Sequence, residues 1–338
     1  MEKYKLVIFG SDWDVYQVAY DELISNPKVL YIETFRPSGV LGLMQRIQFN
    51  PRLNRLLNMP FKSCWNNYYI RQIGKGRVCF LILENWLRME CGIRLLPFLK
   101  NKFPEAKIVC FTQDLIATIK DHYSRHSIDV NYIKRYADLF ISYDTSDAEK
   151  YSIDYHPTVF SPVSAKVLNS ETVAGCDLYF LGRDKGRLDL LVKICREATK
   201  RGLKCRFLLI DVQQEKQIDC EGIEYVTGTV SYLDNLRNCA ASRCIVELLQ
   251  ADAQSPTFRV WEAIALKRKL LTNNAAIVSA DVYDKRYISV FTNAADLDWN
   301  FVSADALPAD VRNQLIDKIR PDSLLNFIED KLNIQINR

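Results

Sequence analysis

Short apolar runs rich in β-branched residues alternate with helix-like stretches along most of the chain. The first half has predicted strands at 5–9, 29–33, 78–83, 107–111 and 137–142, and predicted helices at 15–25, 92–102 and 115–123. An irregular stretch follows at about 151–170, where Pro157 and Pro162 stand among serines. Prolines without a clear hydrophobic period indicate a linker. Repeated strand–helix alternation is typical of a parallel sheet covered by helices.

The same alternation resumes after the linker. Strands are predicted at 177–181, 204–211, 223–226, 244–249 and 269–272, and helices at 187–200, 232–239, 256–266, 309–319 and 322–332. We therefore predict an α/β protein with two Rossmann-like domains that face each other across a cleft. The N-terminal domain is expected at 1–160 and the C-terminal domain at 171–320, with a C-terminal helix and tail at 321–338. A length of 338 residues suits two such domains.

Composition excludes several classes of protein. With 48% apolar and 25% charged residues the chain is globular in character. No segment reaches the ~18 uncharged apolar residues of a membrane span, and no signal-peptide pattern opens the chain. Ten scattered cysteines without a Cys-x-x-Cys pair indicate a reduced, cytoplasmic protein. His122 and His126 have metal-ligand spacing but no third ligand, so we predict surface residues and no metal site.

One stretch of the first half is basic and free of acids. No Asp or Glu occurs from Thr34 to Leu83, whereas eight lysines and arginines lie between Arg36 and Arg77 among aromatic and apolar residues. Such a stretch suits an anionic membrane surface or a phosphate-bearing acceptor. The alternative is the solvated face of an inserted helical hairpin. Nucleic acid also suits the charge, but no nucleic-acid-binding motif is present, so we predict no nucleic-acid partner.

The segment 242–274 carries the most specific chemistry. A buried strand ends near Leu249, and Ser255 and Pro256 mark the start of a helix as its N-cap and first residue. Free backbone N–H groups at Thr257 and Phe258 would make this helix end an anion site for a diphosphate. Two turns into the helix, Glu262 would accept hydrogen bonds from the two hydroxyls of a ribose. Arg259 would add positive charge beside the phosphates.

These residues resemble the donor-binding region of the GT-B glycosyltransferases, especially a bacterial group that acts in capsule, exopolysaccharide and lipopolysaccharide synthesis. The similarity covers about 177–274 and rests on a Gln-Ser/Thr-x-x-x-Arg-x-x-Glu-Ala stretch at 254–263 and the strand-like 267–274. In many retaining members a glutamate stands eight residues before the ribose-binding one. Gln254 takes that place here, which leaves both retaining and inverting mechanisms open. The resemblance implies that Gln254 and Ser255 belong to the donor site.

A second loop supports the same site. The strand ending at Gly182 leads into Arg183, Lys185 and Arg187, whose cations suit a diphosphate while the glycine allows close backbone approach. In GT-B enzymes the corresponding loop lies beside the donor phosphates. The stretch 227–232, with Thr229 and Tyr232, resembles the loop that meets the nucleobase. The alternative for that stretch is a polar turn in which Ser231 caps the next helix.

The catalytic base is expected among acids that follow N-domain strands, because ligands bind outside the carboxyl ends of parallel strands. Asp12 and Asp114 are the preferred pair, and Glu33 and Glu84 occupy similar places. An inverting transferase needs one such group to take the proton of the acceptor hydroxyl. The alternative role for either aspartate is to cap a helix.

We therefore predict a cytoplasmic glycosyltransferase, peripheral on the inner membrane face. It would move a sugar from a nucleotide donor to a glycan or polyprenyl-diphosphate-linked acceptor in bacterial surface polysaccharide synthesis, with the stretch 36–77 at the membrane. No cofactor or metal is expected, and the nucleotide sugar is a substrate. Two alternatives stay open, a nucleotide-sugar epimerase of the same fold and an inactive GT-B partner subunit.

Overall fold

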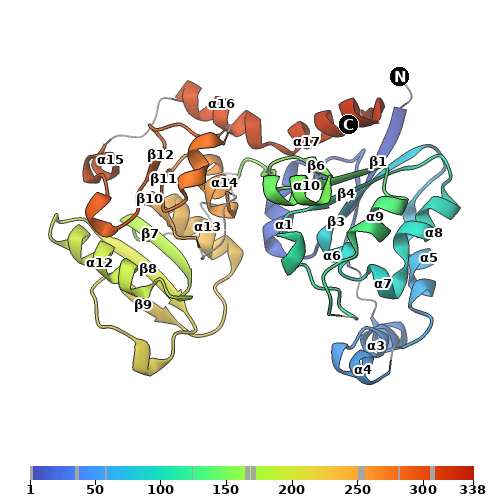
Figure 1. Ribbon diagram of the computed structural model, residues 1–338, viewed down its shortest axis with the longest axis horizontal. Coiled ribbons are helices and arrows are strands. Elements are labelled where there is room, and N and C mark those ends of the chain that lie inside the picture. Colours follow the sequence, from blue (N-terminus) through green and yellow to red (C-terminus); the bar gives the residue numbers. More distant parts are fainter. Residues whose placement is uncertain are drawn as a thin grey trace. The chain divides into compact units, whose positions relative to one another are not determined.

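The protein is described by a computed structural model for residues 3–34, 38–57, 59–123, 125–163, 168, 173–249, 256–280, 282–304 and 309–338. The chain divides into two compact units (Figure 1). Unit 1 comprises Met1–Val159 and Pro321–Arg338, and unit 2 comprises Phe160–Arg320. No helix in these described ranges is long and apolar enough to cross a membrane.

Unit 1 is a parallel sheet with helices on it. Its strands are β1 (Lys3–Phe9), β2 (Leu30–Ile32), β3 (Val78–Leu83), β4 (Lys107–Thr112), β5 (Leu139–Ser142), β6 (Asp154–Tyr155) and β13 (Gln335–Asn337). Its helices are α1 (Asp14–Ala19), α2 (Asp21–Ile24), α3 (Gly39–Gln48), α4 (Pro51–Leu56), α5 (Trp65–Tyr69), α6 (Glu84–Leu87), α7 (Glu90–Ile93), α8 (Leu95–Lys102), α9 (Val130–Tyr136), α10 (Thr145–Tyr151) and α17 (Pro321–Leu332).

The strand order in unit 1 is β13-β1-β3-β4-β5-β6, with β2 also paired to β1, and every pairing is parallel. Strand β13 pairs with the first half of β1 and β2 with the second half, so the end of the chain completes this sheet. All six residues of β3 are buried. Helices on both faces of a parallel sheet explain why its central strands are apolar throughout.

Unit 2 has a second parallel sheet of six strands. They are β7 (Cys176–Arg183), β8 (Cys205–Ile210), β9 (Ile223–Val226), β10 (Ser242–Glu247), β11 (Lys269–Thr272) and β12 (Ile288–Val290). The helices are α12 (Leu188–Thr199), α13 (Tyr232–Ala241), α14 (Phe258–Ala265), α15 (Trp299–Ser303) and α16 (Ala309–Ile319). The apolar face of α12, with Leu191 and Ile194, packs on Phe207 and Leu209 of β8 in the core of this unit.

The predicted α/β class with two parallel sheets is confirmed, and most element positions agree within a few residues. The predicted helix at 115–123 is wrong. Only a short 3-10 turn, Ile116–Thr118, forms there, and Lys120 and Ser127 then pair in an isolated antiparallel bridge that leads the chain away from helical geometry. His122 and His126 are exposed, as predicted.

Candidate functional site

The order of strands in unit 2 creates a switch point between β7 and β10. The sheet reads β12-β11-β10-β7-β8-β9, so the chain builds outward from β7 through β8 and β9 and then crosses to β10 on the other side. In open α/β sheets the loops that leave two such strands at their carboxyl ends diverge, and ligands bind in the crevice between them. The segments after β7 and β10 are the two that the sequence singled out.

The loop after β7 turns one arginine inward. Arg187 Nη1 donates to the Leu248 carbonyl oxygen at 2.8 Å, and Arg187 Nε donates to the Asp184 carbonyl oxygen at 3.0 Å. A Cβ atom on Gly182 would lie 3.2 Å from Arg187 Nη2, so a glycine leaves the room that this guanidinium uses. Burial lowers the pKa of Arg187, and the Asp184 carboxylate opposes that effect. Arg187 thus links the loop after β7 to the loop after β10.

The other two predicted cations of this loop point to solvent. Arg183 Nη2 forms an ion pair with Asp211 Oδ2, which follows β8, at 3.0 Å. Lys185 is exposed and has a left-handed backbone with φ of 44°. The predicted cluster of three cations is therefore one half-buried arginine at the switch point and two exposed side chains around it.

The start of α14 differs from the prediction. Thr257 is the N-cap, because its hydroxyl accepts from the Arg259 N–H at 3.2 Å, and the helix begins at Phe258. The prediction that Pro256 is the first helical residue is wrong, since the proline precedes the cap. Gln254 and Ser255 lie outside the described residues. The Thr257 N–H, expected to be free, points to Glu247 Oε1 at 3.4 Å.

Glu247 is a buried carboxylate that the sequence reasoning missed. It ends β10, and the hydroxyls of Thr257 and Thr272 both donate to it, the latter at 2.5 Å. Burial raises its pKa, and these hydrogen bonds partly offset the effect. The signal was available, because an acid in the apolar run Ile245–Leu248 needs buried partners. Glu247 holds the N-cap of α14 against the sheet.

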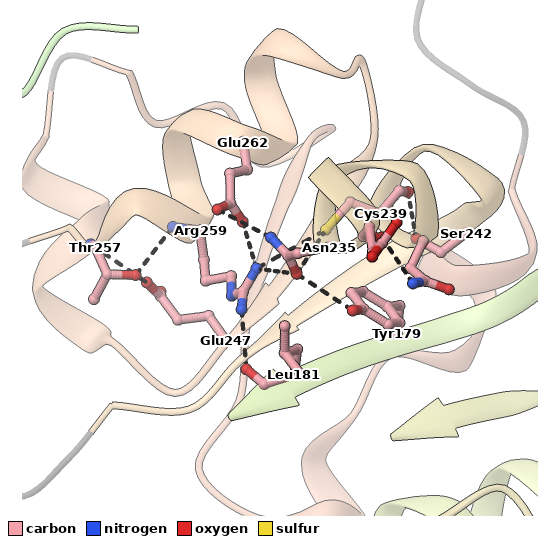
Figure 2. A network of polar contacts seen from close by, with 11 residues as sticks. Tyr179, Leu181, Asn235, Cys239, Ser242, Glu247, Thr257, Arg259 and Glu262 are labelled. Carbon is pink, nitrogen blue, oxygen red and sulfur yellow. Dashed lines mark hydrogen bonds and ion pairs between the residues drawn. The ribbon is translucent and has the colours of Figure 1, made fainter. Parts of the chain in front are cut away.

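Arg259 and Glu262 lie in one internal network with Asn235 of α13 (Figure 2). Arg259 Nη1 donates to Glu262 Oε2 at 2.5 Å and to Asn235 Oδ1 at 2.9 Å. Arg259 Nη2 donates to the Leu181 carbonyl oxygen of β7 at 2.9 Å, and Asn235 Nδ2 donates to Glu262 Oε1 at 3.3 Å. Burial alone would lower the pKa of Arg259, but the charge of Glu262 raises it overall. Arg259 therefore ties α14 to both α13 and the first strand of the switch point.

Glu262 is 2% exposed, yet it keeps room for further hydrogen bonds. A carboxylate has about four acceptor positions, and Arg259 and Asn235 occupy two of them. The buried hydroxyl of Tyr232, at the start of α13, has no hydrogen-bond partner among the described residues. Burial and then the neighbouring Glu262 carboxylate raise the pKa of Tyr232 well above its usual value. The Glu262 carboxylate and the Tyr232 hydroxyl are thus neighbours at this end of α13.

Thr229 lies in the turn between β9 and α13 and is exposed. Gly228 beside it has φ of 90°, and its N–H donates to Asp211 Oδ1 at 3.0 Å. Ser231 caps α13 by accepting from the Asp234 N–H at 3.1 Å. The predicted alternative, in which Ser231 caps the next helix, is therefore confirmed. The turn also lies at the end of β9, beside the end of β8.

In unit 1 the two predicted acids lie on either side of β3. Asp12, after β1, accepts a hydrogen bond from the Thr34 hydroxyl at 3.0 Å. It does not cap α1, whose N-cap is Trp13. Asp114, after β4, forms an ion pair with Arg88 at 3.0 Å, and its side chain is 52% exposed. Burial raises the pKa of Asp114, and Arg88 lowers it in part.

Glu84 follows β3, which lies between the strands that precede Asp12 and Asp114. It is buried, and both the Tyr16 hydroxyl and the Gln113 N–H donate to its carboxylate. Burial first, and then the charge of Asp114, raise the pKa of Glu84 to about 7. The sequence placed Glu84 among the acids that follow strands but favoured Asp12 and Asp114 as the base.

A pocket of about 360 Å³ opens beside Asp12. It is lined by Asp12, Tyr31, Ile32, Glu33, Thr34, Tyr68, Tyr69, Arg71 and Gln72. Carboxylates, hydroxyls, an amide and a guanidinium are the groups that recognise the hydroxyls of a sugar.

A scan against models of protein families finds no match, and a search of curated proteins finds none either. Solved structures do match over nearly the whole chain. A UDP-forming α,α-trehalose-phosphate synthase from Burkholderia xenovorans is similar with a TM-score of 0.59 and 9% identity, covering 98% of this chain and 99% of that one. An α-glucosyltransferase in complex with UDP and a 13-mer DNA has a TM-score of 0.57 and 11% identity, covering 97% and 99%.

The N-terminal domain of Candida albicans trehalose-6-phosphate phosphatase is similar as well, with a TM-score of 0.56 and 10% identity over 98% of this chain and 97% of that one. Identities this low show the fold alone. The fold is that of the GT-B glycosyltransferases. In that fold each half of the chain is one Rossmann-like unit, as found here for units 1 and 2.

Proposed function

We propose that this chain is a glycosyltransferase that moves a sugar from a nucleotide-diphosphate donor to a glycan acceptor. The observation that carries the proposal is the switch point of unit 2, where Arg187 links the loops after β7 and β10 and Arg259 ties α14 to β7. Glu262 and Tyr232 offer an acceptor and a donor nearby. Two of the structures with this fold, the UDP-forming synthase and the UDP-bound glucosyltransferase, are described by the nucleotide they form or bind.

The donor is proposed to lie with its diphosphate at the N-terminus of α14 and beside Arg187. A helix N-terminus attracts negative charge through its dipole, and the nearby guanidinium adds a full positive charge. These groups would stabilise the charge that develops on the leaving nucleotide, so transfer is proposed to need no metal. The ribose hydroxyls would meet Glu262 and Tyr232, and the base would lie near Thr229.

The acceptor is proposed to bind in unit 1 beside Asp12, with its reacting hydroxyl near Asp114. Asp114 is the better base of the pair, because it is half exposed and its pKa is raised. In an inverting reaction Asp114 would take the hydroxyl proton as the oxygen attacks the sugar anomeric carbon. The bond from that carbon to the diphosphate oxygen would break, and its electrons would leave with the nucleotide. Glu84 is buried and acts as a positioning residue.

The acceptor is further proposed to be a lipid-linked glycan of bacterial surface polysaccharide synthesis. The support is the resemblance at 254–274 to that group of enzymes, together with the basic stretch 36–77. An acceptor carried by a polyprenyl diphosphate stays in the membrane, so its transferase must work at a membrane surface.

The test is a thermal-shift panel of UDP, GDP, CMP and dTDP on the wild type and on Tyr232→Phe. A ligand at 100 times its Kd stabilises a folded protein by about 2.7 kcal/mol, which raises the melting temperature. One nucleoside diphosphate is expected to stabilise the wild type, and Tyr232→Phe is expected to reduce the shift. Tyr225→Phe is the matched control, because its hydroxyl bonds to the backbone of Ile218, which is not part of the proposed donor site. A panel with no shift would contradict the proposed donor site.

A further inference from the structure

Helices α3 and α4 carry a large exposed apolar surface. Among the described residues, nine of the twelve large apolar side chains that are exposed lie between Val40 and Phe61. They are Val40, Leu41, Leu43, Met44, Ile47, Leu53, Leu56, Leu57 and Phe61, and we call them the apolar tip. Val40 is 75% exposed and Leu56 is 88% exposed. Exposed apolar side chains that gather in one short segment mark a binding surface.

Amide side chains of the two helices face inward. Gln45 of α3 is buried, and its Nε2 donates to the Tyr69 hydroxyl at 3.3 Å. Gln48 Oε1 accepts from Trp65 Nε1 at 2.6 Å. Asn54 of α4 is buried, and its Nδ2 donates to the Gln48 carbonyl oxygen at 2.6 Å. Amides rather than leucines attach this hairpin to unit 1, so the apolar side chains are turned outward by specific hydrogen bonds.

The charged residues that accompany the apolar tip along the chain are all basic. No acidic residue occurs from Thr34 to Leu83, and Arg46 on α3 and Arg52 on α4 are exposed. Lys62 does not contribute to this surface, because its ammonium donates to the Met59 carbonyl oxygen at 2.7 Å and lies 4.4 Å from the centre of the Tyr123 ring. In Figure 1 α3 and α4 lie at one end of unit 1, beyond α5 and α7.

We propose that the apolar tip inserts into the interface of an anionic lipid bilayer, with Arg46 and Arg52 at the level of the headgroups. An amphipathic helix with exposed leucines on one side and arginines without acids beside them fits such a surface better than a protein partner of mixed charge. The side chains enter the boundary between headgroups and acyl chains, so no membrane-spanning helix is required.

The tip is also connected to the pocket beside Asp12. Helix α3 begins five residues after Thr34, which lines that pocket, and Gln45 of α3 bonds to Tyr69, which lines it too. A bilayer at the tip would therefore hold lipid-linked sugars close to this pocket. This link rests on the proposed function, whereas membrane binding by the tip does not.

The test is co-sedimentation of the full chain with vesicles of phosphatidylglycerol and phosphatidylethanolamine, compared with phosphatidylcholine vesicles. The wild type is expected to bind the anionic vesicles. A triple variant with Leu43→Ser, Met44→Ser and Leu56→Ser is expected to bind at least tenfold more weakly. Val278→Ser, an exposed apolar residue of unit 2, is the matched control and is expected to bind as the wild type.

Charge is tested separately with Arg46→Gln and Arg52→Gln. Each is expected to weaken binding to anionic vesicles by about fivefold, because one basic residue near such a surface contributes about that factor. A wild type that does not bind anionic vesicles, or a triple variant that binds equally well, would overturn the inference. A wild-type dimer that the triple variant converts to a monomer, without vesicle binding, would assign the tip to a second copy of the chain instead.

The same variants distinguish this inference from the proposed function. Their thermal shift with nucleotides is expected to equal that of the wild type, because the tip lies in unit 1 and the proposed donor site in unit 2. Vesicle binding without any nucleotide shift would remove the proposed function and leave the membrane surface. A nucleotide shift without vesicle binding would leave the proposed function standing and overturn the membrane surface.

Discussion

Arg259 and Glu262, one turn apart on α14, form an ion pair with 2.5 Å between Nη1 and Oε2 inside unit 2. The same guanidinium reaches the Leu181 carbonyl oxygen of β7. The pair that the sequence assigns to donor binding is therefore also part of the packing between α14, α13 and the sheet. Substitutions there change stability as well as ligand binding, and the two effects must be measured separately.

Replacing Glu262→Ala is expected to lower the free energy of unfolding by about 3–5 kcal/mol, because it leaves the Arg259 charge buried without its partner. Urea unfolding followed by circular dichroism measures the change. Glu197→Ala is the control, since Glu197 pairs with Lys200 and Arg201 on the surface of α12. That control is expected to unfold as the wild type does. A Glu262→Ala variant as stable as wild type would show that the pair does not hold α14.

Replacing Arg187→Gln is expected to weaken binding of the stabilising nucleoside diphosphate by about tenfold or more, since a hydrogen bond to a charged group contributes about 1.5–3 kcal/mol. Isothermal titration calorimetry measures the affinity. Arg243→Gln is the matched control, because Arg243 is the second residue of β10, at the opposite end of the strand from Leu248, and pairs there with Asp177. Equal affinities for Arg187→Gln and the control would exclude Arg187 from the phosphate site.

Stability is expected to fall as pH rises from about 4.5 to 7, in part because of Glu84. Its folded pKa of about 7 lies above its usual value of 4.5, so between these values the folded state holds a proton that the unfolded state has lost. Its stabilising contribution is complete below pH 4.5 and lost as pH passes 7. Burial similarly raises the pKa of Glu90 to about 8, which adds to the same trend.

The variant Glu84→Gln is expected to reduce this fall in unfolding free energy between pH 5 and pH 8. Chemical denaturation at each pH measures it. Glu105→Gln is the control, because Glu105 is exposed and forms an ion pair with Arg77 on the surface. A pH profile of Glu84→Gln that coincides with the profile of the control would show that Glu84 titrates normally.

Replacing Asp114→Asn is expected to reduce turnover by on the order of 10²–10⁴-fold, the usual contribution of a general base. Nucleotide affinity should stay unchanged, because Asp114 lies in unit 1. Release of nucleoside diphosphate in the presence of acceptor measures turnover. Asp138→Asn provides a comparison, since Asp138 pairs with Lys100 at the other end of the sheet. Unchanged turnover in Asp114→Asn would exclude Asp114 as the general base and leave Asp12 as the candidate.

The sequence by itself determined the α/β class and most element positions. Runs such as Val78–Leu83 are apolar throughout because both faces of a parallel strand are covered, and α12 has an apolar stripe at helical spacing. These signals are local and strong. Strands β12 and β13 have three residues each, too few for a period to be recognised, and β13 forms only because β1 offers it an open edge.

Only the tertiary structure decided how the candidate residues are used. The spacing of Arg183, Lys185 and Arg187 could not show that Arg187 turns inward to Leu248, because that contact joins positions 61 residues apart. Glu247 became a candidate only when folding surrounded it with buried partners, and the same burial distinguishes Glu84 from the other acids that follow strands. Their raised pKa values come from burial, which is a property of the packed unit and not of a local pattern.

The stretch 36–77 shows most clearly what the sequence determines and what only the fold decides. Its lack of acids is plain in the sequence and predicts an anionic partner. Which face of α3 meets that partner could not be predicted, since an apolar helical face normally packs inward. Hydrogen bonds of Gln45 to Tyr69 and of Gln48 to Trp65 reverse that preference, because amides that face inward need partners that only the folded chain supplies. The sequence determined the charge of this surface, and the fold decided that its leucines face outward.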